Sequence, residues 1–462
     1  MFISKRREIP RNKARPYRSG SLGPALPSTQ LNARRLSNDY ASWFQMKFVP
    51  FPSFATNVIH TGNEPDQWGT EDLAPHIACS TAFRQSEPGV FKKFDYSRCG
   101  NPTRDALERS LAAAEDAQYA VTFSSGTAAL ASIVHLLKSG DEIIAGIDLY
   151  GGTSTYFDSV AAGNGVKTKY VDMLDLHEVT SALTLKTKLI WIESPSNPVM
   201  RIVDVQELVK LVKKFNKDII IAADNTFTTP YFLRPLDLGV DISHQSCTKY
   251  LCGHTDVVMG AVAVNDEKLY DRLRFFQINL GAIPSPFDCF LAIRSLKTLP
   301  VRMREHMRSG LIIANFLDLH PCVEKVNHPG LRSHPQYDLF REQSRGYSSV
   351  LSFYVKGNKA DLWKFFKCLK VFTLAASLGG CESIVSFPAV MTHDGIDPEI
   401  LAKAGITQNL ARLSVGLEDV EDLIADLDQA LWASCGENIM KNGKENGMNC
   451  HHDDDDDDDE SD

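Results

Sequence analysis

The sequence lacks the features that define several common protein classes. No window of its 462 residues approaches the ~20 consecutive apolar residues that cross a bilayer, so we expect no membrane span. The ten cysteines form no C-x-x-C pair and show no zinc-ligand spacing, which predicts free thiols in a reducing compartment and no metal site. The first expected strand leads into neither a G-x-x-x-x-G-K-[ST] loop nor a G-x-G-x-x-G turn, so these nucleotide-binding motifs are excluded there.

Neither positive nor negative residues are in large excess outside the two ends of the chain. The net charge of −9 equals the nine acidic residues within Asp453–Asp462, so the remainder is near neutral, which argues against a nucleic-acid partner. Residues 1–45 carry nine Lys or Arg against two acids and predict a disordered basic extension. A mitochondrial transit peptide is the alternative, so both cytoplasm and mitochondrion stay open. Residues 436–462 predict a disordered acidic tail.

Between these ends, the pattern predicts an α/β protein. Residues 46–105 are irregular and read as an N-terminal arm. Residues 106–299 alternate helices with continuous apolar runs, which predicts a large, mostly parallel sheet that helices cover on both faces; the expected strands include Ala120–Phe123, Glu142–Ala145, Val166–Val171, Leu189–Glu193, Ile219–Ala223 and Val240–Ser243. Residues 300–435 predict a smaller α+β domain, after a long helix over 286–316 that Pro300 interrupts.

Three chemically informative groups follow the expected strands. Ser125-Gly126-Thr127 joins a strand to a helix, where free N–H groups bind anions. Asp224 closes an apolar strand, and a carboxylate there needs a cationic partner. Lys249 stands on a turn between buried runs, flanked by Ser246 and Thr248, where burial lowers its pKa. Each has an ordinary structural explanation alone; together they are the phosphate anchor, ring-nitrogen partner and Schiff-base lysine that pyridoxal 5′-phosphate requires.

Six ordered stretches carry a resemblance to a known family. They are Tyr96–Thr103, Asp148–Thr153, Glu193–Pro198, Ala223–Thr226, Ser246–Gly260 and Arg412–Gly416. The chain resembles the Cys/Met-metabolism family of pyridoxal-phosphate (trans-sulfuration) enzymes over residues 51–435, and is most similar to its lyases that act on cystathionine. The resemblance implies the type I fold of pyridoxal-phosphate-dependent transferases, and γ-elimination of L-cystathionine to cysteine, 2-oxobutanoate and ammonia.

The resemblance also implies a role for individual residues. Lys249 would hold the cofactor and move protons, Asp224 would pair with the ring nitrogen, and Tyr150 would stack on the ring. Five residues would hold the phosphate: Ser125, Gly126, Thr127, Ser246 and Thr248. The substrate would be bound by Arg412 with Asn197 and Ser377, beside the acid Asp95. Tyr96 and Arg98 resemble family residues that reach the phosphate in a neighbouring subunit. The resemblance therefore implies a dimer with shared sites and a homotetramer built from dimers.

Two positions depart from the family pattern. The lyases typically carry an arginine where this chain has Thr155 and a glutamate where it has Ala376, and both are thought to bind the far, charged end of cystathionine. Losing both removes charge-assisted bonds that select a long zwitterion. Three alternatives therefore stay open: a methionine or homocysteine γ-lyase, a cystathionine γ-synthase, and, from another class, an inactive scaffold whose acidic tail binds a basic partner.

Overall fold

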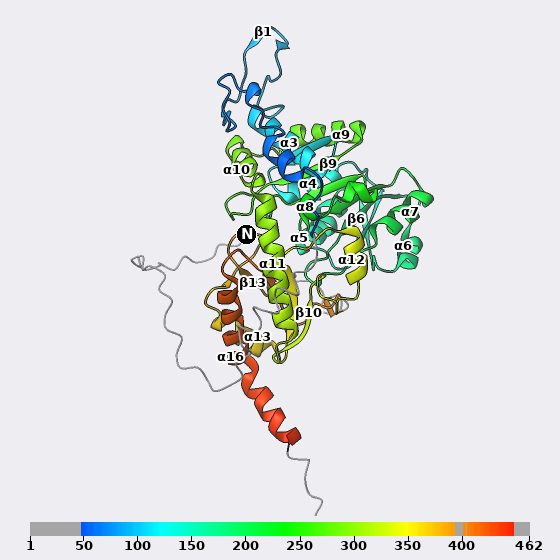
Figure 1. Cartoon of the computed structure of the whole chain (residues 1–462). Coiled ribbons are helices and arrows are strands. Elements are labelled where there is room, and N and C mark those ends of the chain that lie inside the picture. The colour runs from blue at the N-terminus through cyan, green and yellow to red at the C-terminus, as the bar shows by residue number, and fades with distance from the viewer. Residues whose placement is uncertain (1–47, 393–400, 403, 448–462) are drawn as a thin grey trace, which may run out of the picture. The chain divides into compact units, whose positions relative to one another are not determined.

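The computed structural model describes residues 48–392, 401–402 and 404–447 (Figure 1). The predicted basic extension lies outside these residues, as does the poly-Asp segment. The final helix α16, Val420–Gly447, continues past residue 435, where the sequence predicted disorder. Half of residues 436–447 are Gly or Asn, which are weak helix formers, and this composition is the reason that the sequence predicted disorder there.

The larger sheet has seven strands in the order β3-β9-β8-β7-β6-β4-β5. Strands β4 to β8 pair in parallel, and β9 runs antiparallel to both β3 and β8. This architecture confirms the predicted fold class. The strands are β3 (Tyr119–Phe123), β4 (Glu142–Gly146), β5 (Lys167–Val171), β6 (Thr187–Glu193), β7 (Ile220–Asp224), β8 (Ile242–Gln245) and β9 (Gly260–Val264).

Both faces of this sheet are buried, as its continuous apolar strands require. In β6, Leu189 and Trp191 belong to one core cluster, whereas Ile190 and Ile192 belong to another. Successive side chains of a strand point to opposite faces, so the two clusters are the two covered faces. The flanking helices include α3 (Pro102–Glu115), α4 (Gly126–Val134), α6 (Leu176–Ala182), α7 (Val205–Phe215) and α9 (Glu267–Leu280).

A second sheet of five strands follows in the order β10-β11-β14-β13-β12. Its strands are β10 (Val323–Asn327), β11 (Val350–Val355), β12 (Thr373–Leu374), β13 (Ile384–Ser386) and β14 (Leu410–Ser414), and its helices include α13 (Lys359–Cys368) and α16. All strands of the large sheet precede residue 300 and all strands of the second sheet follow it, and a domain boundary at that position stays a prediction.

The predicted long helix over 286–316 is two helices, α10 (Pro286–Leu296) and α11 (Leu299–Asp318). The break comes before Pro300, which occupies the first turn of α11. A proline is tolerated there because the N–H that it lacks would have no partner within the helix. Pro300 therefore marks the start of a helix rather than an interruption.

The N-terminal arm contains α2 (Phe54–His60), a 3₁₀ turn (Pro65–Gln67) and a short hairpin of β1 (Gln85–Glu87) and β2 (Val90–Phe91). Helix α2 packs on α3 through Phe54 and Val58. The hairpin, in contrast, is exposed to solvent along its length. Within the described residues, no helix is both long and apolar enough to span a membrane.

Candidate active site

A cavity of about 320 Å³ lies at the ends of strands of the large sheet, and residues of the second sheet and of the segment after β12 also line it. Strands β6, β7 and β8 each contribute a side chain near their carboxyl ends, and β14 contributes Arg412. Eleven of the residues predicted to bind cofactor or substrate line it: Ser125, Gly126, Thr127, Tyr150, Asn197, Asp224, Ser246, Thr248, Lys249, Ser377 and Arg412. Residues that are far apart in the sequence are thus gathered around one volume.

Lys249 stands on the turn after β8. Its Nζ donates a hydrogen bond to Ser377 Oγ at 3.0 Å. Burial and, to a smaller extent, the neighbouring Arg412 guanidinium lower the pKa of Lys249 to about 8, against the opposing effect of Asp224. A larger fraction of this amine is neutral near pH 7 than for an exposed lysine, as a nucleophile or base requires.

Arg412 reaches the cavity from β14. Its Nη1 donates to Asn197 Oδ1 at 2.8 Å, and its Nη2 donates to the carbonyl oxygen of Ser377 at 3.0 Å. Burial lowers the pKa of the guanidinium to about 10, and its Nε has no partner among the described residues. Ser377 accepts from both cations and has a φ of 98°, a left-handed conformation that is unfavourable for serine. Strain of this kind is typical of functional sites.

The start of α4 forms the predicted anion cradle. Ser125 is the N-cap, and its side chain accepts from Ala128 N at 3.0 Å. A Cβ added at Gly126 would lie 3.0 Å from Ser246, and one added at Gly260 would lie 2.3 Å from the Ser125 carbonyl oxygen. Glycine at both positions thus brings this helix start close to the turn that carries Ser246. Helix N–H groups that lack an internal partner favour an anion at this place.

Asp224 ends β7 and has both of its oxygens engaged. Oδ1 accepts from Thr226 N at 2.9 Å, and Oδ2 lies 3.1 Å from His244 Nδ1. Burial raises the pKa of this carboxyl, but the nearby imidazole and the bonds from Thr226 outweigh burial and lower it overall. The cationic partner that the sequence argument required is therefore His244, which that argument did not identify.

His244 was missed because the strand was placed too early. The sequence suggested a strand over Val240–Ser243, whereas β8 spans Ile242–Gln245. The sequence offered little signal, because His244-Gln245 follows the alternating residues Val240-Asp241-Ile242-Ser243, and the burial of both residues is visible only in the fold. Glu193, the last residue of β6, also lines the cavity and accepts a hydrogen bond from Tyr150 N at 2.9 Å.

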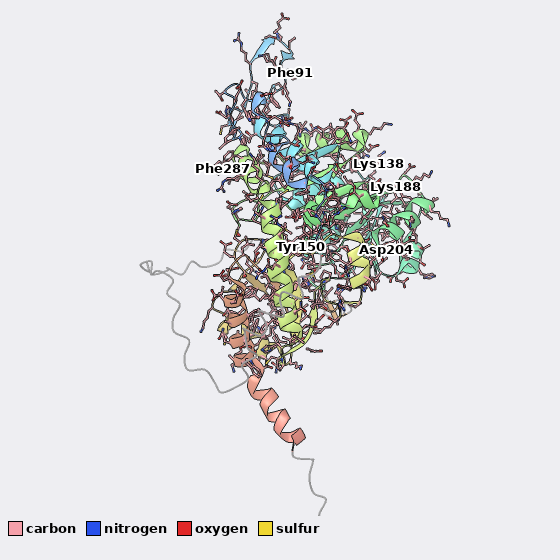
Figure 2. All side chains as sticks on the ribbon, viewed as in Figure 1. Phe91, Lys138, Tyr150, Lys188, Asp204 and Phe287 are labelled. Atoms are coloured by element: carbon pink, nitrogen blue, oxygen red, sulfur yellow. The ribbon has the colours of Figure 1, made fainter. Side chains whose placement is uncertain are left out.

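The arm residues do not line the described part of this cavity. Asp95 accepts a hydrogen bond from Tyr96 N, and the Arg98 guanidinium lies 5.5 Å from the centre of the Tyr96 ring. Figure 2 labels Phe91 on the hairpin and Tyr150 at the cavity, and the two lie well apart. The arm therefore leaves its own cavity uncovered, and the predicted role of these residues at a neighbouring site stays a prediction.

The two departures from the family pattern separate in space. Ala376 lines the cavity. Thr155 ends α5, Gly151–Thr155, is exposed and does not line the cavity. Tyr150 precedes α5 with 46% of its surface exposed, and a Cβ on Gly152 would lie 2.4 Å from its ring. Of the two departures, Ala376 is the one with direct access to a bound molecule.

The cavity satisfies the requirements of pyridoxal phosphate. Its glycine-dependent helix start can hold a phosphate, and the ionised Asp224 can hold a protonated ring nitrogen. Lys249 can bond the aldehyde carbon, and Tyr150 can cover the ring. In the described residues, no cluster of His, Cys, Asp and Glu could hold a metal ion.

Fold and site together define a pyridoxal-phosphate-dependent enzyme. Residues 55–432 match the model of the family "Cys/Met metabolism PLP-dependent enzyme", and the chain belongs to this family. Human cystathionine gamma-lyase is 51% identical over 391 residues, which cover 84% of this chain and 96% of that protein. Yeast cystathionine gamma-lyase superposes with a TM-score of 0.79 at 44% identity, covering 82% of this chain and 98% of the yeast chain.

The similarity extends to a synthase. The structure of cystathionine gamma synthase from Xanthomonas oryzae pv. oryzae in complex with cystathionine superposes with a TM-score of 0.80 at 38% identity. It covers 83% of this chain and 98% of the synthase chain. The fold is therefore shared by lyases and synthases, and the reaction must be argued from the substrate side of the cavity.

Proposed function

We propose that the protein is a cystathionine γ-lyase, which converts cystathionine and water to cysteine, 2-oxobutanoate and ammonia. The observation that carries the proposal is that a base, Lys249, and a cation that can bind a carboxylate, Arg412, both contact Ser377. Lys249 Nζ and Arg412 Nη2 both donate to Ser377, in a cavity that also contains Asp224. The name shared by relatives that are about half identical supports cystathionine as the substrate.

The cofactor would be held by residues of three kinds. The start of α4 at Gly126 and Thr127, with the hydroxyls of Ser246 and Thr248, would bind its phosphate. Asp224 would accept a hydrogen bond from its ring nitrogen and keep that nitrogen protonated. When bound, pyridoxal phosphate supplies an electron-withdrawing ring that stabilises negative charge at the substrate's Cα.

The substrate would be bound by Arg412 and deprotonated by Lys249. Arg412 would bind the α-carboxylate through its guanidinium, which Asn197 and Ser377 hold in orientation. The neutral amine of Lys249 would take the proton from Cα. Loss of a proton from Cβ then allows the bond between Cγ and sulfur to break, and cysteine leaves with its sulfur protonated. Water completes the release of ammonia and 2-oxobutanoate.

A comparison of substrates tests the proposal. Purified protein with added cofactor should have the highest kcat/KM for cystathionine, compared with homocysteine and methionine. Borohydride reduction followed by peptide mapping should place the cofactor on Lys249. If cystathionine were the poorest of the three substrates, the proposal would fail, and a protein that stays colourless with added cofactor would favour the scaffold alternative.

A second candidate keeps the same cofactor residues and changes the reaction. Ala376 lines the cavity without a charge, which favours a shorter substrate such as homocysteine or methionine, or the γ-replacement of a synthase. Incubation of an activated homoserine ester with cysteine distinguishes these reactions. Cystathionine would accumulate with a synthase, whereas a lyase would release 2-oxobutanoate.

We also propose a homotetramer built from dimers in which the arm completes the neighbour's site. The arm exposes large apolar side chains, Leu73, Val90, Phe91 and Tyr96, as expected of a surface that another subunit covers. Light scattering should give four times the mass of one chain, and Arg98→Ala should weaken cofactor binding. We place the enzyme in the cytoplasm; cell fractionation with N-terminal sequencing would instead detect a processed mitochondrial form.

A further inference from the structure

Three titratable side chains lie side by side where three neighbouring strands end. Glu193 of β6 is the register partner of Asp224 of β7, and Asp224 is in turn the partner of His244 of β8. All three strands are parallel, so side chains in register point to the same face. All three residues line the cavity. The proposed function uses Asp224 and leaves its two neighbours without a role.

The surroundings of His244 favour a doubly protonated ring. Its Nε2 forms a hydrogen bond of 3.0 Å with the carbonyl oxygen of Gly126, and its Nδ1 lies 3.1 Å from Asp224 Oδ2 in an ion-pair contact that is not aligned as a hydrogen bond. Both partners are acceptors, and a neutral imidazole has only one N–H to donate. The ring is 3% exposed and stacks edge-to-face on Trp191 at 5.1 Å, so water has little access as a substitute partner.

We propose that His244 is a positioning residue for the cofactor, an imidazolium that joins the start of α4 to Asp224. Through Nε2 it would fix the backbone of the phosphate cradle at Gly126, and through Nδ1 it would fix the carboxylate that faces the ring nitrogen. One buried side chain would thereby set the distance between the two ends of the cofactor site. This proposal rests on the proposed function only through cofactor binding, and does not depend on the substrate.

The charges around His244 are consistent with this role. Burial lowers the pKa of His244, but the Asp224 carboxylate and the Gly126 carbonyl outweigh burial and raise it overall. Burial raises the pKa of Glu193 well above its usual range, and the charges of Asp224 and Asp148 raise it further. These surroundings therefore disfavour a charge on Glu193, whereas Asp224 and His244 each favour the charged form of the other.

Two cationic groups also lie near this row: Lys249 follows β8 and feels the charge of Asp224, and Arg412 feels the charge of Glu193. From α4, His244 meets a backbone carbonyl and no charged side chain among its described contacts. If His244 were neutral, Asp224 would keep its burial cost and would lose its cation. Its pKa would then rise, and with it the pH below which it cannot hold a protonated ring nitrogen.

Replacing His244 with glutamine tests this role. His244→Gln keeps a side chain that can donate to one acceptor but removes the charge, and we expect the dissociation constant of pyridoxal phosphate to rise roughly tenfold at pH 7. The acid limb of a plot of cofactor affinity against pH should move to higher pH. His328→Gln is the matched control, because His328 is fully buried, donates to the Ser348 carbonyl at 3.2 Å and does not line the cavity.

A double-mutant cycle separates positioning from general destabilisation. In an Asp224→Asn background, His244→Gln should weaken cofactor binding less than twofold, because the carboxylate that it positions is gone. Equal losses in both backgrounds, or an acid limb that stays in place, would overturn the proposal. Cofactor affinity is measured without substrate, so this outcome is independent of whether cystathionine is turned over.

A neutron crystal structure of the unmodified holoenzyme near pH 7 tests the same point without a variant. We expect hydrogen isotope on both Nδ1 and Nε2 of His244. A ring protonated on one nitrogen alone would overturn the proposal, even if the glutamine variant failed to fold.

Discussion

The floor and the rim of the cavity are built in different ways. The floor, defined by Glu193, Asp224, His244, Lys249 and Arg412, contains charged or titratable groups, each within hydrogen-bond distance of a partner. The rim, defined by Tyr150, Val258 and Ala376, contributes no charge, and 62% of the Val258 surface is exposed. The floor can therefore fix a cofactor and an α-amino acid, whereas the rim has little with which to select the rest of the substrate.

The largest effect should come from the floor. Lys249→Ala removes the base, and we expect kcat with cystathionine to fall at least about a thousandfold. Lys138→Ala, at an exposed lysine in the segment that follows α4, should keep full activity. Comparison of initial rates and of cofactor content for both variants checks the expectation. Retention of a tenth of the activity in Lys249→Ala would assign the proton transfer to another residue.

A more conservative change of the floor tests geometry rather than charge. Arg412→Lys keeps the positive charge but loses the fork that Asn197 and Ser377 orient, so we expect kcat/KM to fall about a hundredfold, mainly through KM. Steady-state kinetics measure this split. Arg341→Lys, on the exposed surface of α12, Tyr337–Gln343, should behave like the unmodified enzyme. An unchanged KM in Arg412→Lys would remove Arg412 from carboxylate binding.

Much of the floor could be predicted from the sequence because several of its residues belong to short, local sequence patterns. A strand end, a turn and a helix start are visible as short patterns, and these patterns singled out Asp224, Lys249 and the Ser125–Thr127 cradle. The fold class could be predicted in the same way, because apolar runs that alternate with helices indicate a covered parallel sheet, and the structure confirms it.

The rest depends on registers and contacts that no short pattern contains. A shift of two residues in the placement of β8 hid His244, and the pairing of Glu193, Asp224 and His244 is a property of three strands. The difference between Ala376 at the cavity and Thr155 on an exposed helix end is likewise a fact of the folded chain.

The dependence of kcat on pH should show an effect of intermediate size that comes from Lys249 in the floor. Burial and Arg412 lower the pKa of Lys249 to about 8, so its amine is mostly protonated at pH 6 and gains its neutral form as pH rises. We expect kcat with cystathionine to rise about tenfold between pH 6 and pH 7, and to level off above the pKa of the amine. A rate profile across this range measures it. A flat profile would show that proton transfer by Lys249 does not limit turnover.

The smallest effect should come from the rim, where one substitution can add the missing charge. Ala376→Glu places a carboxylate at the cavity, where it can meet the distal ammonium of cystathionine, a group that homocysteine lacks. We expect the ratio of kcat/KM for cystathionine to that for homocysteine to rise about two- to fivefold, the size of an exposed ion pair. Ala376→Gln, with the same shape and no charge, and Thr155→Arg, away from the cavity, should leave the ratio unchanged. An equal gain from Ala376→Gln would assign the effect to shape rather than charge. A gain from Thr155→Arg alone would mean that the rim extends beyond the described cavity. Substrate choice would then depend on residues outside the cavity lining.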